Sequence, residues 1–116
     1  MSQIVLDQQT HPEDSSVVTV VGTKFKGDGF YGRSDGLHTV QYDVNQVYGN
    51  LTIQGTLADD PAESDWTTIE DTRLGDTLFS TKFTGSYYKN FTGNFVWLRV
   101  RGQFTAGVIQ TVLVNN

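Results

Sequence analysis

The residues of this chain that could do chemistry are few and far apart. His11 and His38 are the two histidines, and the chain has no cysteine. A zinc site would need both histidines brought together with a carboxylate, and a hydrolytic dyad would need a nucleophile as well. Without cysteine, no thiolate is available for catalysis or metal binding. We therefore expect two independent surface histidines, with no catalytic residue, no metal and no cofactor.

The densest group of carboxylates lies in residues 58–65, with Asp59, Asp60, Glu63 and Asp65. Their oxygens could hold calcium, but the segment lacks the ligand spacing and the turn glycine of a known calcium loop. A solvated acidic loop is the favoured interpretation. A proline within it could start a single helical turn and no more.

Aromatic side chains outside the expected core are the best candidates for recognition, because flat rings supply contact area at low entropic cost. They could stack on sugars or fill a partner's pocket, or instead cap the open ends of the fold. The candidates for an interface or for ligand stacking are Phe30, Tyr31, Tyr87, Tyr88, Trp97 and Arg99. Trp97 would either cover the outer surface of a sheet beside Arg99 or be buried under a loop or a neighbouring subunit.

The composition indicates which kind of secondary structure must position these residues. The chain has 116 residues, enough for one domain, with 12% aromatic residues, 18% charged residues and 12 glycines. This balance is typical of pleated sheet joined by tight turns. The net charge of -5 disfavours nucleic acid and anionic membrane surfaces as partners. The amino terminus lacks the basic start and apolar stretch of a secretory signal, so we expect synthesis and folding in a cytoplasm.

Alternating apolar residues predict the strands. Residues 38–44 and 51–57 are predicted to pair through a turn at 45–50. Residues 95–101 and 108–114 are predicted to form a hairpin across the glycine-flanked segment 102–107. Residues 17–21 are expected to form a central strand, and residues 85–91 an aromatic-rich loop.

About eight short strands and no helical periodicity indicate an all-β fold, an antiparallel β-sandwich or jelly roll. We expect one domain over residues 1–116, with 1–16 as an extended amino-terminal arm. In the last predicted hairpin, Val96, Leu98 and Val100 are expected in the core, because a strand with two arginines usually turns them to water.

Four segments together resemble a pattern seen in small structural proteins of tailed bacteriophages. A strand over residues 48–57 is followed by the acidic loop and then by Asp65-Trp-Thr-Thr-Ile69; a later Trp97-Leu-Arg99 strand leads through a glycine into residues 104–109. The resemblance implies a β-sandwich displayed on a capsid, neck, tail or fibre, commonly as a symmetric oligomer. It brings no catalytic motif.

Two functions follow as hypotheses. The first is a non-enzymatic virion protein, a capsid decoration or minor structural protein, that attaches to other virion proteins and forms a homo-oligomer. Strands at the ends of the chain could add to a neighbour's sheet. The alternative is a carbohydrate-binding β-sandwich module for attachment to host-surface glycans, with Trp97 or the Tyr87 and Tyr88 pair as stacking platform. An enzyme ranks below both, because a glycosidase requires two opposed carboxylates in a cleft.

Overall fold

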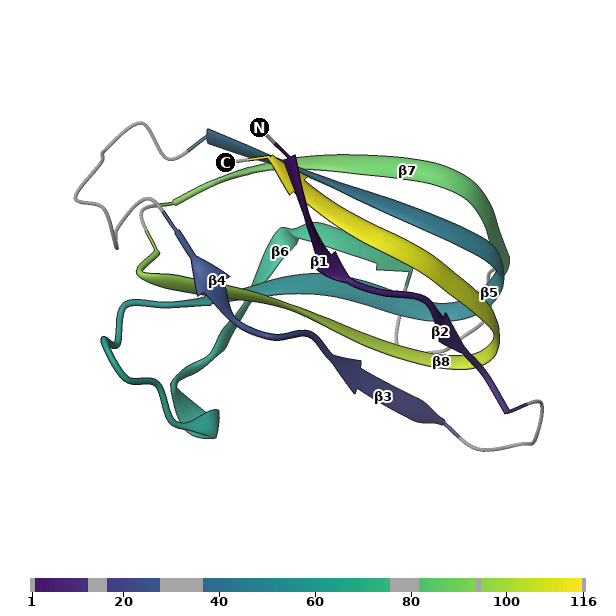
Figure 1. Cartoon of the computed structure of the whole chain (residues 1–116), viewed down its shortest axis with the longest axis horizontal. Helices are drawn as coiled ribbons and strands as arrows, with labels where there is room; N and C mark the ends of the chain where they lie inside the picture. Colours follow the sequence, from purple (N-terminus) through teal and green to yellow (C-terminus); the bar gives the residue numbers. More distant parts are fainter. Residues whose placement is uncertain (1, 13–16, 28–36, 76–81, 94, 116) are drawn as a thin grey trace.

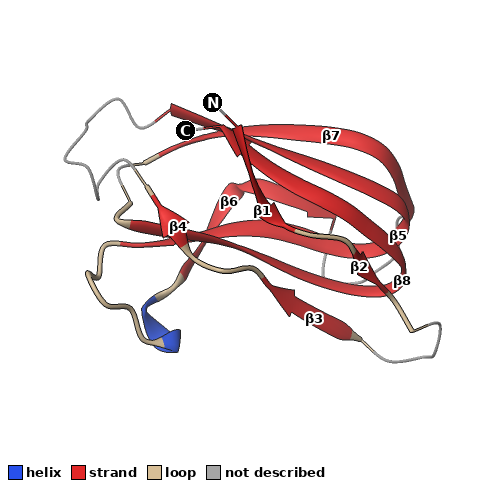
Figure 2. Ribbon diagram, viewed as in Figure 1, coloured by secondary structure: helices blue, strands red, loops and turns tan. Residues whose placement is uncertain are grey.

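The structure is a computed structural model that describes residues 2–12, 17–27, 37–75, 82–93 and 95–115. These residues are almost entirely strand, with one short helical turn (Figure 2). The elements are β1 (Ser2–Leu6), β2 (Gln9–Thr10), β3 (Val18–Val21), β4 (Phe25–Lys26), β5 (Leu37–Thr56), the 3-10 turn η1 (Glu63–Asp65), β6 (Thr67–Gly75), β7 (Lys82–Thr92) and β8 (Trp97–Asn115). The predicted all-β fold is confirmed.

Two long strands organise the molecule. β5 and β8 pair with each other in antiparallel register along most of their length, and both bend midway, so each contributes to two layers (Figure 1). In the first layer β7 pairs with the first half of β5, and β1 and β2 pair with the second half of β8. In the second layer β6 pairs with the second half of β5, and β3 and β4 pair with the first half of β8. All pairs are antiparallel, as expected for a sandwich.

Both predicted hairpins are wrong. Residues 38–44 and 51–57 do not pair with each other, because they belong, apart from the exposed Leu57, to the two halves of the bent strand β5. Residues 97–101 and 108–114 belong in the same way to the two halves of β8, and Phe95 and Val96 precede this strand. The segments 45–50 and 102–107, predicted as turns, lie inside β5 and β8. They are the points where these two neighbouring strands pass from one layer to the other.

The two bends lie side by side. In the register of β5 and β8, Asn45 is opposite Val108 and Tyr48 is opposite Ala106, so two residues of β5 face the single residue Gly107. This is the arrangement of a β-bulge, which bends a strand and raises its twist. Gly107 has a φ of +96°, a conformation that glycine adopts without the steric cost of a side chain.

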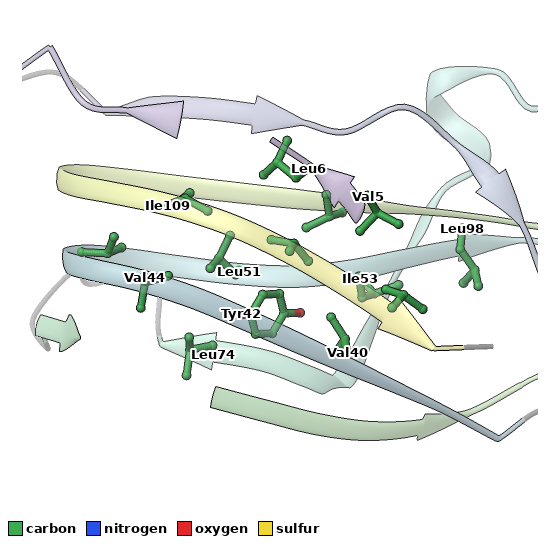
Figure 3. Packing of buried hydrophobic residues seen from close by; sticks show 14 of the residues in the cluster. Val5, Leu6, Val40, Tyr42, Val44, Leu51, Ile53, Leu74, Leu98 and Ile109 are labelled. Carbon is green, nitrogen blue, oxygen red and sulfur yellow. The ribbon is translucent and has the colours of Figure 1, made fainter. Parts of the chain in front are cut away.

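The core lies between the layers and follows the predicted alternation (Figure 3). Val40, Tyr42 and Val44 of the first layer face Leu51 and Ile53 of the second, and all are buried. Leu98 and Val100 are buried as predicted. Val96 is only half-buried, and Phe95 packs against the core in its place, so the prediction for Val96 is wrong. Period-two alternation predicted the inward residues correctly where the chain is in a regular strand, and Val96 precedes the start of β8.

One buried polar group ties the layers together. Thr72 of β6 donates its hydroxyl to the carbonyl of Ile69 at 2.6 Å and accepts the backbone N–H of Ile53 at 2.8 Å. Its own carbonyl accepts a hydrogen bond of 2.9 Å from the Tyr42 hydroxyl, which reaches across from the first layer. Burial raises the pKa of the Tyr42 hydroxyl, so this donor keeps its proton. The Thr72 side chain thus replaces a backbone partner where the pairing of β5 and β6 is interrupted between Leu51 and Ile53.

Three further predictions concern segments that lie at the edges of the sheet. Among the strands that the structure describes, β3 pairs with β8 alone and is an edge strand, so the expectation of a central strand at residues 17–21 is wrong. Residues 85–91 form part of β7 and are not a loop. Of the arm expected over residues 1–16, the described part, residues 2–12, lies against β8 through β1 and β2.

Candidate functional site

The outer face of the second layer carries a covered arginine. Arg99 lies opposite Gln54 and donates Nε to the Gln54 side-chain oxygen at 2.8 Å. Its two terminal nitrogens donate to the carboxylate oxygens of Glu63 at 3.0 and 2.7 Å, and its guanidinium lies 4.5 Å from the ring centre of Trp66. Arg99 is only 7% exposed. It points away from the core as predicted, but the expectation that it meets water is wrong, because Glu63 and Trp66 from the loop between β5 and β6 cover it.

Trp97 is fixed under the same loop. Its indole Nε1 donates to the carbonyl of Asp59 at 2.9 Å, and the Lys24 ammonium lies 4.5 Å from its ring centre. Trp97 was expected either to stack beside Arg99 or to be covered by a loop or a neighbouring subunit. The structure shows the contact with a loop, and the ring that stacks on Arg99 is Trp66. Trp97 is therefore not an open stacking platform.

The acidic loop is solvated, as predicted, and structural. Its four carboxylates are on exposed residues, and it contains the single 3-10 turn, in which Asp65 accepts the backbone N–H of Ala62 at 2.8 Å. Within the described ranges, no group of three or more histidine, aspartate or glutamate side chains is placed to hold a metal ion. The loop's clearest contact with the sheet is the bidentate pair of Glu63 with Arg99.

The pair of Glu63 and Arg99 gives a pH-dependent prediction. The hydrogen bonds and the charge of Arg99 lower the pKa of Glu63 below its ordinary value of 4.5. A carboxyl group whose pKa is lower in the folded state contributes stability above its unfolded pKa, and that contribution is lost as the pH falls through the folded pKa. We expect Glu63→Gln to unfold at a slightly lower urea concentration than the parent at neutral pH and at the same concentration near about pH 2.

The effect should be small, because the Glu63 side chain is 82% exposed and water weakens the pair. Asp60→Asn is the matched control, since Asp60 forms no ion pair within the described part of the chain. The interpretation fails if the difference between Glu63→Gln and the parent does not depend on pH. A second pair, Glu70 with Arg73, has its glutamate pKa shifted in the same direction and remains intact in both variants.

Both histidines are buried, so the prediction of surface histidines is wrong. Each is about 1% exposed. His11 packs edge-on against Phe104, with 5.3 Å between ring centres, and His38 lies against Phe91 at 4.9 Å. The carbonyl of Gly93 lies 3.3 Å from His38 Nε2. The two side chains pack as part of the core, and their burial depends on aromatic partners that are distant in the sequence.

The predicted tyrosine pair is split between the two faces of β7. Tyr87 is opposite the buried Tyr42, packs edge-on against Phe83 and donates its hydroxyl to the carbonyl of Thr84 at 3.1 Å. Tyr88 is opposite Gln41 on the outer face of the first layer and is 69% exposed. Of the recognition candidates that the structure describes, Tyr88 alone presents a largely exposed ring. Phe30 and Tyr31 lie outside the described residues.

A groove runs along the open side of the sandwich, where the edges of the two layers approach each other. Its volume is about 480 Å³, and it is lined by residues 4–7, Gln9 and residues 21–25. The two sides approach each other closely at Gly22, where a Cβ would lie 2.6 Å from the carbonyl oxygen of Val5. The large apolar side chains of Ile4 and Val21 are exposed beside it. Sequence reasoning missed this groove, because residues 17–21 were expected in the middle of a sheet.

The four edges of the sandwich differ in charge. β6 carries Glu70, Asp71 and Arg73 at its irregular pairing with β5, and β7 carries Lys82 and Lys89. Bulges and charged side chains on an edge strand are the usual protection against unwanted pairing. The sequences of β1, Ser-Gln-Ile-Val-Leu, and β3, Val-Thr-Val-Val, contain no charged residue. β1 has an irregular pairing with β8 between Ile4 and Leu6, and β4, which lies on the same edge as β3, carries Lys26. The edge strands beside the groove that carry no charged residue are thus β1 and β3.

Comparisons with known proteins give a weak structural likeness and no match in sequence. No protein family model and no curated protein matches the sequence. Among solved structures, the K3 cleaved adhesin domain of Lys-gingipain from Porphyromonas gingivalis w83 is similar over 99% of this chain and 73% of that one, with 11% identity and a TM-score of 0.48. A likeness this weak says nothing about function. The function of this chain therefore has to be argued from its own residues.

Proposed function

We propose that this chain is a non-enzymatic attachment module of a bacteriophage particle, a capsid decoration or minor structural protein, which binds a neighbouring virion protein through the open side of its sandwich. The observation that carries the proposal is the pair of uncharged edge strands, β1 and β3, on either side of an apolar-rimmed groove. The resemblance to phage structural proteins supplies the class of partner; it rests on residues 48–57, 65–69, 93–101 and 104–109.

The geometry suits an extended segment from the partner. An edge strand presents backbone N–H and C=O groups that a partner strand can pair with, and the neighbouring side chains give specificity. Ile4 and Val21 flank the groove and would be covered by such a segment. Lys24 is the positive charge among the lining residues and Asp7 the negative one, so the occupant we expect is an extended segment with little net charge.

The same edges provide for self-association. When two copies pair the same edge antiparallel about a two-fold axis, one patch of each copy is used, which closes the assembly and leaves the second uncharged edge of each copy for attachment. The homo-oligomer expected from the sequence would form in this way before or during attachment. Its partners in the particle would be capsid, neck or tail proteins, and its location the virion.

Val21→Lys tests the proposal. We expect this variant to bind purified phage particles at least about tenfold more weakly than the parent, because a charge on the uncharged edge must be desolvated on docking. Sedimentation of labelled protein with particles measures the change, and light scattering measures the oligomer in the same samples. Val21 is already largely exposed, so the thermal midpoint should stay near that of the parent.

Thr67→Lys is the matched control, since it places the same charge at an exposed site on the β6 edge. It should bind like the parent. Equal binding by Val21→Lys and the parent, or a strictly monomeric parent with no affinity for particles, would overturn the proposal.

A further inference from the structure

The outer face of the first layer is a second surface, which borders the groove at Ile4 and extends away from it to β7. One row of side chains crosses all four strands of this face in register: Ile4 on β1, Leu113 on β8, Gln41 on β5 and Tyr88 on β7. The largest exposed rings and chains of the row are at its two ends, where Tyr88 is 69% and Ile4 is 61% exposed. With neighbouring strands about 4.8 Å apart, the row extends for roughly 14 Å.

Polar side chains flank Tyr88 on both sides, and hydrogen bonds hold them in place. On one side the hydroxyl of Thr39 donates to the Asn90 side-chain oxygen at 2.7 Å. On the other, Asp43 Oδ1 accepts from the Gln41 amide at 3.0 Å and from the Ser86 hydroxyl at 2.5 Å. Side chains fixed in this way lose less freedom when a ligand binds, which improves affinity.

The same bonds leave particular atoms available. Within the described part of the chain, no hydrogen bond uses the Asn90 amide nitrogen, the Gln41 side-chain oxygen or Asp43 Oδ2. The Tyr88 ring therefore lies between a donor on one neighbour and acceptors on two others. A flat apolar ring between fixed donors and acceptors suits a ligand that is itself apolar on its faces and hydroxylated on its rim.

We propose that the outer face around Tyr88, Gln41, Asp43, Ser86 and Asn90 binds a neutral glycan, with a sugar ring stacked on Tyr88 and its hydroxyl groups bonded to the side chains on either side. This site goes beyond the protein attachment proposed at the groove, because it lies on another surface and takes another class of ligand.

The charge of the face selects neutral sugars. Asp43 is the charged residue of this face that lies beside the ring: Lys89 is opposite the inward-facing Val40 and so belongs to the other face of β7, and the exposed Lys82 is opposite Tyr48, six positions along β7 from Tyr88. A carboxylate beside the ring and a net charge of -5 oppose sialylated or phosphorylated glycans. The same repulsion opposes nucleic acid, whose bases could otherwise stack on the tyrosine.

The test uses the full chain and an array of neutral gluco-, manno- and galacto-oligosaccharides, followed by titration calorimetry with the oligosaccharide that binds. We expect at least one of these sugar classes to bind. Tyr88→Ala should weaken binding about tenfold or more, as loss of a stacking ring does elsewhere. Tyr88→Phe keeps the ring and should stay within about threefold of the parent, because losing one partly exposed hydroxyl contact costs little.

Leu57→Ala is the matched control, since Leu57 is an equally exposed apolar residue in the loop over the other layer. It and Val21→Lys should leave glycan binding unchanged, which separates this site from the groove. An array without signal at the highest soluble protein concentration would overturn the proposal. So would glycan binding that Tyr88→Ala leaves unchanged, because the sugar would then be bound elsewhere.

Discussion

Gly107→Ala is expected to lower the free energy of unfolding by about 3 kcal/mol or more, one of the two largest single-residue effects that we predict. At a φ of +96° an alanine is strained wherever it points. Here its Cβ would also overlap the Gln46 carbonyl and lie 2.7 Å from the backbone nitrogen of Val47. Those atoms belong to the bend of β5 and cannot move without disturbing the pairing of the two long strands.

Urea unfolding followed by tryptophan fluorescence measures this change. Gly85→Ala is the matched control, because Gly85 has a φ of +119° but open space around its Cα. It isolates the cost of placing a non-glycine residue at positive φ, about 1–3 kcal/mol. If the two variants lose the same stability, the close approach of the two bends does not hold the layers together as described.

Thr72→Val is expected to cost about 2–3 kcal/mol at nearly constant volume, because two buried backbone groups lose a partner. The Ile53 N–H loses its acceptor at 2.8 Å, and the Ile69 carbonyl loses its donor at 2.6 Å. Thr72 is fully buried, so water cannot take the place of the hydroxyl without opening the core.

Urea unfolding again gives the stability, and hydrogen exchange of the Ile53 amide reports the local effect. Thr72→Ser keeps the hydroxyl and loses one methyl group, so it should retain the slow exchange of that amide while losing about 1 kcal/mol. An Ile53 amide that exchanges as slowly in Thr72→Val as in the parent would show that another group satisfies it.

Side-chain alternation was predictable because it is local. The inward set Val40, Tyr42 and Val44 and the inward pair Leu98 and Val100 are buried as expected, since the parity of side chains on a strand does not depend on what the strand pairs with. The single helical turn of the acidic loop was predictable for a similar reason.

The path between the half-strands was not predictable from local signals. A glycine-marked break such as 102–107 is compatible with a reversal and with a bend, and the choice depends on the neighbouring strand. Here Gln46 and Val47 of β5 face Gly107 of β8, so the two breaks fit each other as one shared bend. The sequence of either segment alone does not indicate which residues of the other strand lie opposite it.

The coverage of the outer faces was not predictable either. The parity of Arg99 was right, but its burial comes from Glu63 and Trp66, which precede it by more than thirty residues. The orientation of Tyr87 and Tyr88 required the knowledge that residues 82–92 form an edge strand. Recognition residues could therefore be predicted by type, while the sequence did not indicate which of them is presented to a partner.

Hydrogen exchange of the chain, free and bound to purified phage particles, tests the proposed attachment most directly. The account predicts that binding slows the exchange of backbone amides in Ser2–Leu6 and Val18–Val21, the two uncharged edges beside the groove, and leaves Thr67–Gly75 unchanged. Protection confined to the β6 and β7 edges, with β1 and β3 exchanging as in the free protein, would contradict it.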